Sequence, residues 1–289
     1  MNAAETVAAS VSEWTDHHSL TLAATAKRRW HTLENLGLTL LFAAMIALPL
    51  VEIGLRQFSS GIPSAPEFLR HLTLLIGMLG GAIAAREGRL LALATVPAFL
   101  GPRFRTITAS FASATAVAIS AVLCFASVKF VLQERAAGGH LPYGIPLWVV
   151  QLALPLGFGA IALRLVERSA ETWRGRALTL ALAVTAGLAA AFAPTGVALA
   201  GLVSATLLGV PIFATLGGAA LILFWGHHVP VASVAVDHYG LVTNPALPAI
   251  PLFTVAGFFM AEGGASRRLM RVFIALSGWL RGGPAIATA

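Results

Sequence analysis

The sequence predicts an all-α integral membrane protein that crosses the bilayer several times, and three observations support this class. Apolar residues make up 57% of the 289-residue chain and charged residues only 11%, whereas about 25% of an average soluble domain is charged. The mean hydropathy is +0.83. The apolar residues form continuous runs rather than the alternating pattern of a barrel strand, and in lipid helices satisfy every backbone amide within one segment.

This composition excludes a soluble enzyme, a disordered protein and a coiled coil. The single cysteine, Cys124, excludes a disulfide framework and a cysteine-based metal cluster. The net charge of +7 is scattered between apolar blocks, which is typical of the loops of a membrane protein. We therefore expect the lipid bilayer as a partner and no nucleic acid.

Isolated charges bound the first four predicted helices, since about 20 apolar residues cross a bilayer core. The first helix is predicted at 36–56 and the second at 66–86, after a proline-rich turn. The third lies between Arg105 and Lys129. The fourth is predicted at 145–166.

A run of 60 uncharged residues precedes Asp237 and has room for two or three crossings. Breaks are predicted near Pro194 and at 209–211, where proline removes a backbone donor. A further apolar run ends at Glu262, and a last one begins near Val272. The prediction is about seven or eight hydrophobic segments in all.

Lysine and arginine are distributed unevenly between the loops. Up to Arg176, eleven lie before the first helix or in the loops after the second and fourth, and only four lie on the opposite side. The positive-inside rule therefore predicts a cytoplasmic N-terminus and a fourth helix that ends in the cytoplasm near residue 168. Residues 1–35 are expected to form an uncleaved cytoplasmic tail, with a surface helix over Leu20–Trp30, because no cleavage motif follows the first apolar run.

The four-helix segment resembles the small membrane subunit (DctQ) of the tripartite ATP-independent periplasmic (TRAP) transporters. One departure is 87–91, where the family often has a histidine followed by a β-branched residue. The residues that carry the resemblance are Glu34, Val51–Arg56 with Glu52 and Arg56, Pro66–Arg70 with Glu67 and Arg70, Gly77–Arg86, Gly144–Trp148 and Leu154–Phe158.

The carboxy-terminal third is similar to the opening of the large TRAP membrane subunit (DctM). The matching segments are Leu208–Ile212 with Gly209 and Pro211, Ala249–Met260 with Pro251, Gly257 and Met260, Gly263–Leu269, and Gly278–Gly283 with Gly282 and Gly283.

The two resemblances predict a fusion of small and large subunits. Residues 1–35 are the tail, 36–168 the four-span module, 169–193 a linker with a bridging helix, and 194–289 the start of an elevator-type large subunit. In the family the large subunit begins on the periplasmic side, so one additional crossing is needed. Ala177–Phe192 supplies it, and the helix is expected to begin within Trp173–Arg176.

The resemblance implies a transporter component of the bacterial inner membrane rather than an enzyme. It implies import of an organic acid, a carboxylate, that a periplasmic substrate-binding protein delivers, with sodium as the coupling ion and no other cofactor. The sodium and substrate sites are expected beyond Ala289, in the remainder of the large subunit, so the sequence looks truncated. A structural membrane subunit or anchor stays the alternative; a membrane-embedded enzyme is disfavoured because the long uncharged run offers only Thr, Ser and His.

Ionisable residues within membrane segments are functional candidates by default. For Glu52 and Arg56, four residues apart, we expect an interfacial ion pair, with contact to the binding protein as the alternative. Glu262 is expected to be a helix-end charge, the alternative being a contact between moving and static parts.

Asp237-His238-Tyr239, with His227 and His228 upstream, is expected to be a polar loop rather than a metal site, because adjacent histidines diverge on a helix.

Pro245, Pro248 and Pro251 predict a loop followed by a helix that begins near Pro251, the alternative being an irregular stretch beside the transport path. Two sets of glycines are expected at close helix contacts: Gly77 with Gly81, and Gly209 with Gly217 and Gly218.

Overall fold

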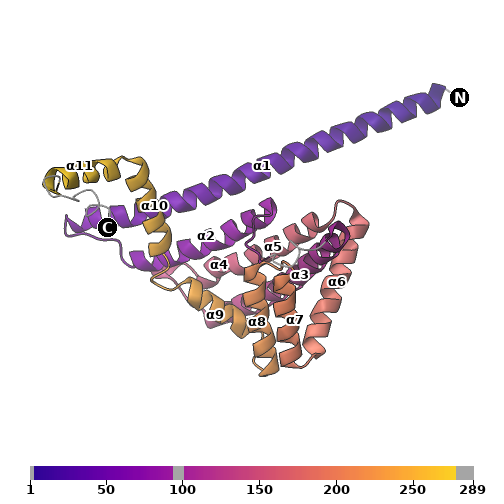
Figure 1. The fold of residues 1–289 in the computed structure, drawn as a ribbon. Coiled ribbons are helices and arrows are strands. Elements are labelled where there is room, and N and C mark those ends of the chain that lie inside the picture. Colours follow the sequence, from indigo (N-terminus) through magenta and orange to yellow (C-terminus); the bar gives the residue numbers. More distant parts are fainter. Residues whose placement is uncertain (1–2, 94–100, 278–289) are drawn as a thin grey trace.

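The computed structural model describes residues 3–93 and 101–277, and within these ranges the chain is helical without a β-strand. Figure 1 shows the arrangement. The α-helices are α1 (Ala3–Arg56), α2 (Ala65–Glu87), α3 (Pro102–Ala137), α4 (Leu147–Gln151), α5 (Ala153–Ser169), α6 (Trp173–Phe192), α7 (Thr195–Leu207), α8 (Ile212–Gly226), α9 (Ala232–Val242), α10 (Ala249–Glu262) and α11 (Ala265–Ser277).

Five helical segments of the described chain are long and apolar enough to cross a membrane. They are 28–56 of α1, α2, 107–137 of α3, α4 with α5, and α6. α10 and part of α11 form a sixth candidate, bent by 66°. An all-α, multi-pass membrane protein is therefore confirmed, and the first four predicted helices correspond to α1 to α5.

α1 is longer than the sequence predicts. The expected tail and first span form one helix of 54 residues, which corresponds to about 81 Å. Figure 1 shows its amino-terminal half projecting away from the other helices. No break separates Leu20–Trp30 from the span that follows, because 3–56 contains a single proline, Pro49.

α3 lies at the centre of the bundle and contacts α5, α6, α8 and α9. The largest cluster of buried apolar residues surrounds it and joins both ends of the chain in one core. Members of this cluster come from five other helices and one turn as well as from α3 itself: Leu74, Met78, Ala116, Ile119, Leu123, Phe130, Leu154, Phe158, Leu202, Val210, Ala214 and Val234.

Three of the glycines permit close helix packing. A Cβ on Gly217 or Gly218 of α8 would lie 2.8 Å from a side-chain carbon of Leu123 or Ile119 on α3, which confirms the predicted contact at this pair. A Cβ on Gly81 would make an ordinary contact of 3.5 Å. Gly77 has open space around it, so the expectation of close packing was wrong for this residue.

The bridging helix α6 begins at Trp173, as predicted, and Thr172 caps it by accepting a hydrogen bond from the Gly175 amide at 3.3 Å. Breaks follow at Pro194 and at 208–211, also as predicted. The helices that result, α7 and α8, have 13 and 15 residues. They are about 20 and 22 Å long, shorter than the roughly 30 Å core of a bilayer.

The region after α8 corrects one expectation and confirms another. Asp237-His238-Tyr239 lies within α9 and not in a loop, because its aromatic side chains pack against other helices. Within the apolar run that ends at Glu262, residues 243–248 separate α9 from α10. α10 begins at Ala249 with Pro251 in its first turn, which confirms the predicted loop and helix start.

Candidate functional site

The two ends of the chain meet on a surface that includes a buried polar pair. We call α1 to α5 the amino-terminal part and α7 to α11 the carboxy-terminal part; α6 joins them. α9 packs on α3 and α2, and α8 packs on α3.

His71 of α2 and Tyr239 of α9 form a hydrogen bond across this contact. His71 is 7% exposed. Its Nδ1 lies 2.8 Å from the Glu67 carbonyl oxygen, and its Nε2 lies 2.8 Å from the Tyr239 hydroxyl. Because a carbonyl only accepts, Nδ1 carries the proton, and Nε2 accepts from the tyrosine. The pair links helices that are 168 residues apart in the chain.

Aromatic rings surround this hydrogen bond. The ring of Phe130 lies 5.6 Å from that of Tyr239, and the ring of Phe158 lies 5.4 Å from that of His238. Gln151 is fully buried on the neighbouring α4. Burial lowers the pKa of His238 and raises the pKa of the Tyr239 phenol. Both groups are thereby held in their neutral forms at this contact.

A backbone contact joins the parts at the opposite end of the bundle. The Ile212 amide donates to the Leu91 carbonyl at 2.9 Å, and Ala92 forms an isolated bridge with Pro211. Gly209 has a φ of 110°, which a side chain would disfavour. The turn between α7 and α8 therefore depends on glycine and is held by the segment that follows α2.

Three charged residues brace the amino-terminal part internally. Glu34 of α1 forms ion pairs with Arg86 of α2, at 2.7 Å, and with Arg164 of α5. Their side chains are only 9 to 12% exposed. Arg86 also donates to the Asn35 amide oxygen at 2.8 Å, and Arg168 donates to the Arg86 carbonyl at 2.9 Å. One carboxylate thus ties three helices at the end where α2 and α5 finish.

Glu52 and Arg56 form the predicted ion pair at 2.9 Å. Glu52 also accepts from the Ile62 amide at 2.6 Å and so holds the loop between α1 and α2. The Arg56 side chain is 69% exposed. The ion pair is confirmed, whereas its place at the membrane interface and a contact with a binding protein stay predictions.

The other predicted positions are dispersed. The Glu67 carbonyl accepts from His71, and the Arg70 Nε is buried without a hydrogen bond among the described residues. Three positions lie on α10, a helix without a buried residue, and Glu262 is its last residue, as expected. Pro251, Gly257 and Met260 are the three on α10, whereas Gly282 and Gly283 lie outside the described residues.

The upstream histidines follow the end of α8. His228 has a φ of 57° at this turn. Within 3–93 and 101–277, no group of three or more His, Cys, Asp or Glu residues is placed to hold a metal ion.

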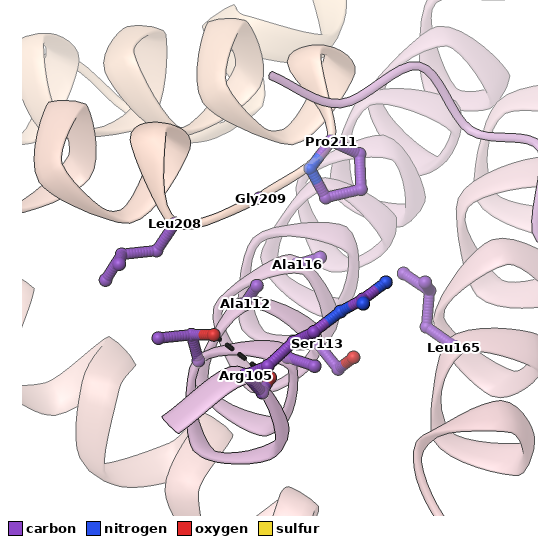
Figure 2. A pocket seen from close by; sticks show the side chains of 10 residues that line it. Arg105, Ala112, Ser113, Ala116, Leu165, Leu208, Gly209 and Pro211 are labelled. Atoms are coloured by element: carbon purple, nitrogen blue, oxygen red, sulfur yellow. Dashed lines mark hydrogen bonds between the residues drawn. The ribbon is translucent and has the colours of Figure 1, made fainter. Parts of the chain in front are cut away.

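A cavity of about 500 Å³ lies at the contact, next to the turn between α7 and α8. Figure 2 shows that the Arg105 side chain extends across it toward Leu165. The remaining lining consists of hydroxyl and small or apolar residues from α3 and the turn: Thr108, Ala109, Ala112, Ser113, Ala116, Leu208, Gly209 and Pro211.

Two family models match the chain, one on either side of α6. The model of the tripartite ATP-independent periplasmic transporters, DctQ component, matches residues 45–175. The model of the tripartite ATP-independent periplasmic transporter, DctM component, matches residues 199–289. The chain belongs to the TRAP transporter family. It joins a DctQ component to a DctM component, and almost all of α6 lies between the two matches.

Curated TRAP relatives match one or both parts. The isethionate TRAP transporter permease protein DctMQ of Oleidesulfovibrio alaskensis is 27% identical over 77% of this chain and 37% of its own length. The C4-dicarboxylate TRAP transporter large permease protein DctM of Vibrio cholerae is 42% identical over 28% of this chain. The protein of the same name from Rhodobacter capsulatus is 33% identical over 30% of this chain. The chain spans 37%, 18% and 20% of these relatives.

The TRAP relatives are transporter permeases, so the chain is a transporter component and not an enzyme. The contact between α2 and α9 is therefore a contact between DctQ and DctM. The DctQ match covers His71 and the DctM match covers Tyr239. The backbone contact between Leu91 and Ile212 joins the same two components.

Proposed function

We propose that this chain is the membrane part of a TRAP transporter that imports an organic acid. The observation that carries the proposal is the presence of DctQ and DctM components in one chain, packed on a common core around α3. A periplasmic substrate-binding protein delivers the acid, and an inward sodium gradient drives its uptake. The protein lies in the bacterial inner membrane with a cytoplasmic N-terminus.

The bracing of the DctQ part supports a static role for it. The Glu34 carboxylate ties α1, α2 and α5 together, and Glu52 holds the loop between α1 and α2 by accepting a hydrogen bond from the Ile62 amide. The α7–α9 segment of DctM packs on this framework. In the proposed mechanism this framework stays fixed while a transport domain moves against it. The substrate is a small organic acid, and the names of the relatives make C4-dicarboxylates and the sulfonate isethionate the first compounds to test.

Reconstitution tests this function. The protein is expressed from its native reading frame, purified and placed in proteoliposomes with an inward sodium gradient. We expect uptake of a labelled organic acid that requires both sodium and a soluble binding protein from the same organism. Uptake driven by ATP would contradict the proposal. An absence of uptake with every binding protein of the organism would favour the alternative, a structural subunit.

A further inference from the structure

The helices of the α7–α8 hairpin are shorter than the hydrocarbon core of a bilayer. They are about 20 and 22 Å long, whereas α6, with 20 residues, spans about 30 Å. Figure 1 shows the three helices side by side with their far ends together. The turn at 208–211 therefore stops about 10 Å short of the level at which α6 begins. The cavity lies next to this turn, between α3 and α5.

The polarity of the cavity changes along α3. Arg105 and Thr108 line its outer end, next to the start of the membrane-spanning segment at Ile107. Ala112 and Ala116 line the inner end, together with Leu208 of the turn. From Arg105 to Ala116 the helix rises about 16 Å. The cavity is thus cationic at the membrane surface and apolar below it.

Two hydrogen-bond donors in this cavity are available to a ligand. Neither the Arg105 guanidinium nor the Ser113 hydroxyl forms a hydrogen bond or an ion pair with the residues that the structure describes. The Thr108 hydroxyl already donates to the Arg105 carbonyl, at 3.0 Å. No carboxylate lines the cavity. Since the planar guanidinium fork matches the geometry of a phosphate group, the outer end favours a phosphate-bearing anion.

We propose that this cavity binds one anionic phospholipid. Its phosphate lies on Arg105, and the first methylenes of its acyl chains fill the apolar end beside Ala112, Ala116 and Leu208. A free phosphate ion has the same charged chemistry but would leave the apolar half of the cavity unfilled. Basic pockets between transmembrane helices bind acidic lipid headgroups in this way.

Lipid retention tests the proposal on the protein expressed from its native reading frame. After extensive detergent washing, bound lipids are extracted and quantified by mass spectrometry. We expect the wild-type protein to retain an acidic phospholipid such as phosphatidylglycerol. Arg105→Gln is expected to lower that retention about fivefold or more, which corresponds to the loss of about one favourable charge contact. Arg89→Gln is the matched control, because Arg89 lies at the same end of the bundle, is 82% exposed and does not line the cavity.

A second measurement separates the possible ligands. Short-chain phosphatidylglycerol is expected to raise the unfolding temperature of the wild-type protein and of Arg89→Gln, but not that of Arg105→Gln. Short-chain phosphatidylcholine and inorganic phosphate are expected to have little effect. If inorganic phosphate raised the unfolding temperature as much as phosphatidylglycerol does, the ligand of the cavity would be a free anion and not a lipid. Equal retention by both variants, or an equal effect of phosphatidylcholine, would overturn the proposal.

Discussion

The Tyr239 hydroxyl donates a hydrogen bond to His71 Nε2, at 2.8 Å, across the contact between the DctM and DctQ components. His71 is almost completely buried, and its other ring nitrogen is bound to the Glu67 carbonyl. The orientation of the imidazole is thereby fixed from both sides. A polar contact of this kind favours one register of α9 on α2, because a shifted register would leave the imidazole acceptor unpaired.

Tyr239→Phe is expected to lower the free energy of unfolding by about 1 to 3 kcal/mol, because it leaves a buried acceptor on His71 without a partner. The measurement is chemical denaturation in detergent. Tyr143→Phe is the matched control, since Tyr143 is the other tyrosine of the chain and is 69% exposed. Equal losses in the two variants would show that the hydrogen bond does not stabilise the contact.

Glu34→Gln is expected to destabilise the DctQ part by about 3 to 5 kcal/mol, because Arg86 and Arg164 would remain nearly buried without their counter-ion. Glu171→Gln serves as the control, since Glu171 is exposed and forms no ion pair with the described residues. Thermal unfolding of the purified variants provides the comparison. A loss for Glu34→Gln no greater than that of the control would mean that the triad contributes little net stability.

Gly209→Ala is expected to cost about 1 to 3 kcal/mol, because the φ of 110° is unfavourable for any side chain. Gly201→Ala in α7 is the control: a Cβ there meets no atom within 4 Å, and alanine in a helix is expected to be neutral or stabilising. Unfolding temperatures of the two variants should move in opposite directions. A tolerated Gly209→Ala would show that the turn between α7 and α8 relaxes readily.

Cysteine labelling tests the bridging role of α6. Glu171→Cys and Gly196→Cys place a thiol at an exposed position on either side of this helix. A membrane-impermeant maleimide, added to intact spheroplasts, is expected to label Gly196→Cys and not Glu171→Cys. The wild-type chain is the control, because its one cysteine, Cys124, lies within the membrane-spanning part of α3. Labelling of both variants from the same side would contradict a crossing by α6.

The local elements of the fold were predictable because they depend on neighbouring residues. Charges bounded the four spans of the DctQ part, and Pro194 and 209–211 marked the ends of helices since proline lacks an amide donor. The prediction from neighbouring residues was wrong at Asp237-His238-Tyr239, which lie in helix α9. Their polarity predicted a loop, but the two aromatic members are stabilised in a helix by packing against Phe130 and Phe158.

The residues of the contact were harder to predict. Glu34 and Arg164 are 130 residues apart in the chain. His71 and Tyr239 are 168 residues apart. Hydrophobic periodicity shows which face of a helix is buried but not which helix covers it. One signal was available: arginines at the ends of apolar runs, such as Arg86 and Arg164, need a carboxylate partner when they are buried. The sequence offered several such partners, and only the packing of α1 against α2 selects Glu34.

The continuous helix α6 also has a consequence for biosynthesis. Because one polypeptide contains both components, a ribosome makes them in equal numbers and they are never diluted apart. α6 has 20 residues and keeps the two components attached at its ends, so their docking is an intramolecular event. A modest docking surface around α9 then suffices for complete pairing, whatever the expression level of the gene.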